Sequence, residues 1–253
     1  MDLNRYFIEF SYDGSAFHGW QSQPNALSVQ EVVQDGLSKL LKKKTSIIGA
    51  GRTDAGVHAR QMYAHFNASI KEENLNDLVF LLNNYLPKSI NIISLKNVRV
   101  TAHARFDAIE RSYEYFISTA KDPFTNSYHY FLKNAPDINL MNEAAKSLLN
   151  YKDFKCFSKS NTDVKTFRCN ITNASWSKNE NKLVFYITSD RFLRNMVRSI
   201  VGTLLEIGLN KRPLQDMKHT IESRDRSKAG FSVPAKGLFL TKIIYPSNVF
   251  LKK

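Results

Sequence analysis

The ten residues from Gly49 to His58 combine small side chains with one arginine and one carboxylate. Arg52 and Asp54 are two residues apart, and the glycines and alanines around them leave the backbone open to close approach by a ligand. A carboxylate beside a guanidinium on so bare a backbone indicates a functional site rather than a packing element. The alternative is a glycine-rich surface turn in which Asp54 only accepts hydrogen bonds from nearby amides.

The chain is strongly basic, with 36 Lys and Arg residues against 23 Asp and Glu residues and a net charge of +13. Most of this excess follows residue 105. Such a charge suits a polyanionic partner, because phosphates that bind cationic side chains release their counterions. A lysine-rich surface in contact with solvent gives the same composition. The charge therefore indicates a class of partner and not a reaction.

Composition excludes several other classes of protein. A hydrophobic content of 43% is typical of a globular chain of 253 residues. No run of about 18 uncharged apolar residues is present, which excludes a membrane-spanning helix, and the charged N-terminus does not fit a signal peptide. The two cysteines, Cys156 and Cys169, lack metal-binding spacing, and the histidines form no metal-binding pair. We expect no metal site and a reducing, cytoplasmic location.

The periodicity of the first hundred residues predicts elements in the order β-α-β-β-α-β, which is the ferredoxin-like pattern. A capping box from Ser28 to Glu31 predicts the start of the first helix. The other expected elements are a half-buried strand over 5–12, a strand at about 46–49 that leads into the glycine motif, its return through 62–66, a helix from Asn74 and a strand over 90–98.

A similar order recurs in the second half. Its expected elements are strands over 111–117, 168–176, 183–188 and 238–245, helices over 139–149 and 191–208, and a short helix starting at Pro213. The sequence therefore predicts two α+β domains, 1–105 and 106–253.

Residues 49–58 closely resemble the active-site motif of the tRNA pseudouridine synthase A family. Further motifs that resemble this family follow in order along most of the chain: Tyr12-Asp13-Gly14, Gly19-Trp20-Gln21-Ser22-Gln23, Ser28-Val29-Gln30-Glu31, His103-Ala104-Arg105-Phe106, Arg111-Ser112-Tyr113-Glu114-Tyr115, Met196-Val197-Arg198, Ala229-Gly230 and Gly237-Leu238. Two positions depart from the pattern. Ala102 stands where the family commonly has Phe, and Val233 stands where Ala is usual.

The resemblance implies a fold and an activity. The fold would be two ferredoxin-like, RRM-like α+β units whose antiparallel sheets join into one large sheet, with a basic cleft between them, in a homodimer. The activity would be isomerisation of uridines 38, 39 and 40 in the tRNA anticodon arm to pseudouridine. An isomerisation needs neither a cofactor nor a metal.

The resemblance also implies roles for particular residues. Asp54 would be the essential catalytic carboxylate, and Arg52 would fill the space that the flipped-out base leaves or hold the neighbouring phosphate. Tyr113 would stack on the uracil, Arg198 would pair with the carboxylate, and Leu238 would line the uracil pocket. Alternatives remain for several of these residues. Arg52 fits an ordinary surface position, and Tyr113 and Leu238 fit the apolar faces of their strands.

Three further arginines are candidates for RNA contact. Arg105 belongs to the His-Ala-Arg motif. Arg191 and Arg194 share with Arg198 the i, i+3, i+7 spacing of one helix face, which fits RNA contact and a solvated face equally well. Basic and aromatic residues also alternate over 151–168, where the lysines are candidates for tRNA contact and the aromatic side chains for the core.

Two functions from other classes compete with the isomerase. One is an RNA-binding module of the same fold without turnover, against which the intact Arg-Thr-Asp core argues. The other is a phosphate-handling enzyme in which residues 49–56 form a nucleotide loop. That loop lacks the terminal Lys-Ser/Thr of the phosphate-binding consensus, which argues against this function.

Overall fold

The computed structural model describes residues 3–160 and 164–251, and the chain divides into two compact units. The first unit contains residues up to 109 together with those from 240 onward, and the second contains residues 110–239. The sequence predicted domains 1–105 and 106–253. The division differs because the last strand returns to the first unit, a long-range pairing that periodicity does not reveal.

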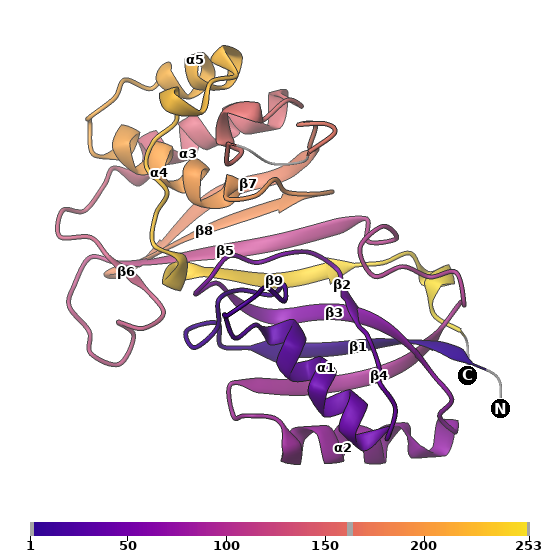
Figure 1. Ribbon diagram of the computed structural model, residues 1–253. Helices are drawn as coiled ribbons and strands as arrows, with labels where there is room; N and C mark the ends of the chain where they lie inside the picture. The colour runs from indigo at the N-terminus through magenta and orange to yellow at the C-terminus, as the bar shows by residue number, and fades with distance from the viewer. Residues whose placement is uncertain (1–2, 161–163, 252–253) are drawn as a thin grey trace. The chain divides into compact units, whose positions relative to one another are not determined.

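The first unit is built on a sheet in the order β4-β1-β3-β9, in which β1 is antiparallel to β3 and β4 (Figure 1). Its strands are β1 (Asn4–Tyr12), β3 (His58–Ala68), β4 (Ile90–Val98) and residues 240–244 of β9 (Leu238–Ile244), and the short β2 (Ile48–Gly49) pairs with β3. The predicted β-α-β-β-α-β order is confirmed.

Two helices complete the first unit. Helix α1 (Val29–Leu40) begins at Ser28, whose Oγ accepts a hydrogen bond of 3.2 Å from the Glu31 amide, as the capping box predicts. It lies across the face of the sheet (Figure 1). Helix α2 (Leu75–Tyr85) follows a short 3-10 turn and packs against α1 and β4.

Strand β1 differs from the prediction of a half-buried strand, because both of its faces are buried from Tyr6 to Phe10. The second face is covered by the C-terminal segment. The Phe7 ring packs edge-on against Tyr245 and Phe250, with centroid distances of 5.1 Å and 6.0 Å. These partners are more than 200 residues away in the sequence, so alternation within the strand could not indicate them.

The second unit has a sheet in the order β5-β8-β7 with antiparallel pairing, and β6 adds to β5 in parallel. The strands are β5 (Glu110–Ser118), β6 (Tyr130–Phe131), β7 (Ile171–Asn179) and β8 (Lys182–Ser189), and the helices are α3 (Ile138–Lys146), α4 (Met196–Gly208) and α5 (Asp216–Ser223). Helix α3 packs against α4 and β7. The predicted α+β class is therefore confirmed in both units. In the part of the chain that is described, no helix is both long and apolar enough to cross a membrane.

Helix α4 starts at Met196, not at residue 191 as predicted. Asn195 precedes it with a φ of 66°, a left-handed conformation that interrupts the helix. Its Nδ2 donates hydrogen bonds to the hydroxyls of Ser199 (3.0 Å) and Ser232 (2.6 Å), which hold this turn. Arg191 and Arg194 therefore lie in the preceding loop. The prediction that they share a helix face with Arg198 is wrong.

The buried α4 approaches the segment 229–233 so closely that no side chain fits between them. A Cβ on Gly202 would lie 1.8 Å from the Phe231 carbonyl oxygen. The Thr203 hydroxyl accepts a hydrogen bond from the Gly230 amide at 2.8 Å and donates one to the Ser199 carbonyl at 2.9 Å. These contacts hold the segment 229–233, which follows α5 in the chain, against α4.

We expect Thr203→Val to lower the free energy of unfolding by about 1–3 kcal/mol, because it leaves the buried Gly230 amide without its acceptor. Valine has almost the same shape as threonine, so lost packing contributes little. Urea denaturation measures the change. Thr203→Ser keeps the hydroxyl and serves as the control, and an equal loss in both variants would contradict this assignment.

Candidate functional site

The Gly-Arg-Thr-Asp motif forms the loop between β2 and β3 in the first unit. Thr53 anchors this loop. Its hydroxyl lies 2.8 Å from the Tyr12 hydroxyl, and its carbonyl accepts a hydrogen bond of 3.2 Å from the Trp20 amide. On either side of this buried residue, Arg52 is exposed and Asp54 is half-buried. The loop thus holds its middle residue in the protein and leaves its two charged neighbours accessible.

The end of the motif is held by a second anchor. His58 is buried, and its Nδ1 lies 3.0 Å from both the Gly14 amide nitrogen and Asp13 Oδ1. The Val57 amide also donates a hydrogen bond of 3.1 Å to the Asp54 carbonyl, which closes a turn around Gly56. The end of β1 and the segment that follows it therefore support the motif at its middle and at its last residue.

Glycines around the motif serve two different purposes. A Cβ on Gly14 would lie 2.1 Å from the Val57 carbonyl oxygen, and one on Gly49 would lie 2.4 Å from the Trp20 ring. These two positions are occupied by glycine because the chain packs there without space. A Cβ on Gly51 would meet no described atom within 4 Å. Internal packing therefore does not require a glycine at position 51, and the space beside it, next to Arg52, is open.

Arg105 lies on another loop of the first unit, which buried hydrogen bonds hold. The Ala104 amide donates to His65 Nδ1 at 3.1 Å, and the Ala104 carbonyl accepts from the Tyr245 hydroxyl at 2.5 Å. Arg105 and Phe106 are exposed, with the guanidinium carbon 5.6 Å from the ring centroid. The loop thus presents a cation beside an aromatic ring.

The departure at Ala102 is accommodated by close packing in the same loop. Ala102 is fully buried, its amide donates to the Arg99 carbonyl at 2.8 Å, and its own carbonyl accepts from Arg5 Nη1 at 2.9 Å. The backbone at this position is therefore held on both sides.

The His65 imidazole is neutral, so its Nδ1 can accept the hydrogen bond from the Ala104 amide. Burial lowers the pKa of His65 to about 4, and the nearby His103 and Arg5 act in the same direction. The desolvation of a charged imidazole is unfavourable, which is why burial has this effect.

In the second unit, Arg198 lies in the first turn of α4 and is fastened to Val233. Arg198 Nε donates to the Val233 carbonyl at 2.7 Å, and the Val233 amide donates back to the Arg198 carbonyl at 3.3 Å. The Tyr115 hydroxyl donates to the next carbonyl, that of Pro234, at 2.8 Å. The departure at Val233 is accommodated in the core, where its side chain is fully buried.

Tyr113 and Leu238 occupy different environments. Tyr113 shares a face of β5 with Tyr115 and Ile117, which are fully buried, but it is itself only half-buried. Its ring packs edge-on against Phe192 at 5.1 Å. Leu238 is buried at the start of β9. Tyr113 therefore keeps an accessible part that an ordinary core residue lacks, whereas the burial of Leu238 fits a core position and a pocket lining equally.

The structure brings some of the predicted site residues together and assigns others to different units. Arg52 and Asp54 share one loop of the first unit, and Arg105 lies on a second loop of that unit. The second unit contains Tyr113, Arg191, Arg194, Arg198 and Leu238. Residues 3–160 and 164–251 contain no group of three or more His, Cys, Asp or Glu side chains that could hold a metal ion.

The sequence did not indicate a cavity of about 530 Å³ in the second unit. Its lining residues are Lys155, Ser158, Lys159, Ser160, Phe167, Arg224, Asp225 and Arg226. Lys155, Lys159 and Phe167, which belong to the alternating basic and aromatic stretch, line one wall. The signal in the sequence for the other wall is the Arg-Asp-Arg run that follows α5, about 60 residues later in the chain.

We expect Gly14→Ala to lower the free energy of unfolding by about 3 kcal/mol, the upper end of the cost of overpacking, because the added methyl group would overlap the Val57 carbonyl. Gly51→Ala should change it by less than about 0.5 kcal/mol, because its added methyl group would meet open space. Thermal and urea denaturation of both variants test this contrast. Equal destabilisation would show that Gly51 is also required by packing.

His65 should make unfolding dependent on pH. Its pKa is about 4 in the folded chain against an ordinary value of 6.5, so protons bind preferentially to the unfolded chain between these values. The contribution of His65 to stability is complete above pH 6.5 and is lost as the pH falls to about 4, a change of about 3 kcal/mol.

This dependence is measured as the difference between wild type and His65→Gln in urea denaturation from pH 7 to pH 4. The glutamine can still accept the Ala104 amide but does not titrate in this range. The exposed His219 provides the control, because His219→Gln should keep the wild-type dependence. An unchanged profile in His65→Gln would contradict the assignment.

A family model for tRNA pseudouridine synthase matches residues 9–107 and 144–246. The tRNA pseudouridine synthase A of Bacteroides fragilis is 48% identical over 251 residues, covering 99% of this chain and 100% of that protein. The proteins of the same name from Porphyromonas gingivalis and Clostridium acetobutylicum are 46% and 38% identical, over 98% and 94% of this chain and 100% and 98% of their own lengths. With matches that span both units and the Gly-Arg-Thr-Asp loop, this chain belongs to the tRNA pseudouridine synthase family.

Proposed function

We propose that this protein converts uridines 38, 39 and 40 of the tRNA anticodon stem-loop to pseudouridine. Family membership over nearly the full chain supports the reaction. The observation that carries the proposal for this chain is the anchored loop of the first unit, which keeps Arg52 exposed and Asp54 half-buried. The space beside Gly51 gives a ligand room to approach that backbone.

The reaction rearranges one nucleotide. The bond between N1 of the uracil and C1′ of the ribose breaks, the base turns, and C5 bonds to C1′. C5 loses its hydrogen and N1 gains one, so the atoms balance without a redox partner or an energy source. The target base must leave its stack, at a cost of a few kcal/mol. Asp54 supplies the carboxylate that acts on the ribose and base.

Four other residues support this chemistry in the proposal. Arg52 fills the space that the flipped-out base leaves or holds the neighbouring phosphate. Tyr113 stacks on the uracil with the accessible part of its ring, and Arg198 pairs with the Asp54 carboxylate. Leu238 lines the uracil pocket and helps to exclude water, which would otherwise hydrolyse the sugar intermediate.

The tRNA partner is bound largely through its backbone. The net charge of +13 favours a polyanion, and the Arg105–Phe106 pair offers a cation and an aromatic face on one loop. Arg191 and Arg194 extend these contacts from the loop before α4. The protein acts as a cytoplasmic homodimer, and the tRNA lies in a basic cleft.

Asp54→Asn should abolish isomerisation while tRNA binding is largely retained, because one carboxylate contributes little to an interface driven by phosphate charge. Release of tritium from tRNA labelled at uridine C5 measures turnover, and filter binding measures affinity. Wild type should release tritium to water without any added cofactor. Turnover by Asp54→Asn would show that another residue supplies the carboxylate.

A matched control is Asp77→Asn, which removes the same charge from an exposed position on α2. It should keep wild-type turnover. A wild-type protein that binds tRNA without releasing tritium would be the non-catalytic RNA-binding module of the same fold.

A further inference from the structure

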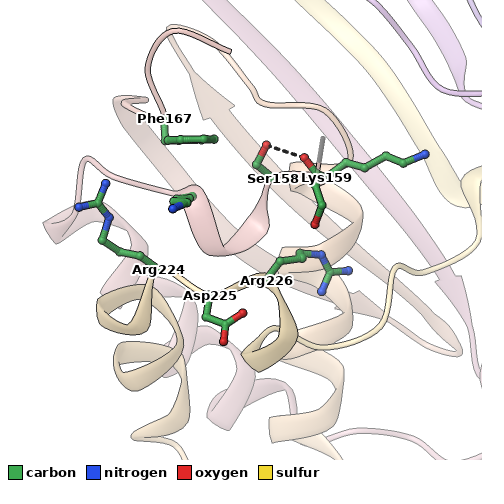
Figure 2. A pocket seen from close by; sticks show the side chains of 8 residues that line it. Ser158, Lys159, Phe167, Arg224, Asp225 and Arg226 are labelled. Atoms are coloured by element: carbon green, nitrogen blue, oxygen red, sulfur yellow. Dashed lines mark hydrogen bonds between the residues drawn. The ribbon is translucent and has the colours of Figure 1, made fainter. Parts of the chain in front are cut away.

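The basic cavity of the second unit lies between two separate segments of the chain (Figure 2). Figure 2 shows Phe167 and the Ser158–Lys159 segment along one side, with Arg224, Asp225 and Arg226 along the other. Its volume of about 530 Å³ is large enough for a nucleotide-sized group. None of its residues is among those to which the family resemblance assigns a role at the uridine.

Four cationic side chains and one carboxylate line this cavity. Two of the cations have internal partners. Arg224 Nη2 forms an ion pair of 2.9 Å with Asp153 Oδ2, and Arg226 donates hydrogen bonds to the Gly230 carbonyl and the Ser232 hydroxyl. The carboxylate of Asp225 accepts the Ser227 amide at 2.8 Å.

The two lysines differ from these arginines. Among the described residues, no ion pair joins the Lys155 or Lys159 ammonium group to a carboxylate. Lys155 does act electrostatically on Asp225, where it adds to the hydrogen bonds from Ser227 that lower the pKa of that carboxyl group. The cavity is lined by four cationic groups and only one carboxylate, so its cations repel one another, and a bound anion relieves this repulsion. The cavity is therefore suited to a phosphate.

Phe167 adds an aromatic surface to the same cavity. Its ring is half-buried, and Lys155 Nζ lies 5.8 Å from the ring centroid. A phosphate-binding cation next to an accessible ring is the combination by which proteins bind single-stranded nucleic acid, with the base stacked on the ring and the backbone on the cation.

The cavity is connected to the segment that holds Arg198. Ser232 accepts hydrogen bonds from Arg226 in the cavity and from Asn195 before α4, and the next residue, Val233, binds Arg198. The Lys159 amide also donates to the Arg194 carbonyl at 3.0 Å. The lysine wall of the cavity is thus joined to the loop that leads into α4.

We propose that this cavity binds the backbone of the tRNA substrate, with one phosphate at Lys155, another at Lys159 and the base next to Lys155 stacked on Phe167, at nucleotides other than the one that is isomerised. The identity of the RNA rests on the proposed function. The basic and aromatic lining is an independent observation of the structure. The cavity would therefore contribute affinity for tRNA rather than chemistry.

The test compares two double variants that remove the same charge. Lys155→Ala with Lys159→Ala removes the two lysines of the cavity, and Lys146→Ala with Lys178→Ala removes two exposed lysines elsewhere in the unit. Filter binding to tRNA is measured over a series of KCl concentrations. Circular dichroism melting verifies that each variant is folded.

The cavity variant should bind tRNA about 10- to 30-fold more weakly at 0.15 M KCl. The slope of log affinity against log salt should fall by about 0.7–0.9 for each lysine that contacts a phosphate. In isomerisation assays KM should rise and kcat should be retained. The control variant should keep the wild-type slope. An unchanged slope in the cavity variant would overturn the proposal.

The stacking contact has its own variants. Phe167→Ala should weaken tRNA binding about tenfold, and Phe167→Tyr should restore it, because any aromatic ring can stack on a base. Equal weakening by alanine and tyrosine would remove the stacking role from the proposal.

Failure of this proposal can be told apart from failure of the proposed function. A wild-type protein that binds tRNA with lysine-dependent affinity but releases no tritium would refute the isomerase and support the cavity. If the wild type turns over tRNA and the cavity variant keeps its affinity for tRNA, the isomerase is supported and the cavity proposal is refuted. If the variant loses affinity for polyglutamate but not for tRNA, the cavity binds acidic peptides and the proposal is wrong.

Discussion

The position of Asp54 depends on the contacts that the end of β1 and the segment after it make with the glycine-rich loop. Tyr12 and Trp20 hold Thr53 through its hydroxyl and its carbonyl, and Gly14 packs directly against Val57. A loop with so few side chains has little packing energy of its own, so its conformation must be imposed by neighbours. These anchors act on the buried Thr53, so Arg52 and Asp54 on either side of it stay accessible. The proposed chemistry is possible only while this support is intact.

In the second unit, a glycine contact and a buried hydrogen bond likewise hold a loop segment, here against α4. Gly202 allows the segment 229–233 to touch the helix, and the Thr203 hydroxyl bonds to the Gly230 amide. The same segment then receives Arg198 at Val233 and Tyr115 at Pro234. One close backbone contact therefore orients an arginine that the family resemblance assigns to the active site. The same segment contacts the basic cavity through Ser232, which accepts a hydrogen bond from Arg226, so it borders both Arg198 and the cavity.

Two kinds of cationic residue differ in their surroundings. Some are structural, such as Arg226, which binds backbone carbonyls, and Arg224, which pairs with Asp153. Others are exposed cations beside aromatic rings, as at Arg105 with Phe106 and Lys155 with Phe167. The second group has the form that a nucleic-acid partner requires, because the backbone of RNA binds cations and its bases stack on rings. Net charge alone could not distinguish these groups.

The sequence by itself determined the element order, the capped start of α1 and the family, because these depend on local periodicity and on motifs that are contiguous in the chain. Tertiary structure decided the rest. Ser232 helps hold the turn at Asn195 that delays α4, and distant aromatic residues cover the second face of β1. The basic cavity joins segments about 60 residues apart. Each of these features depends on partners from remote parts of the chain, and local periodicity contains no information about which remote segments will meet.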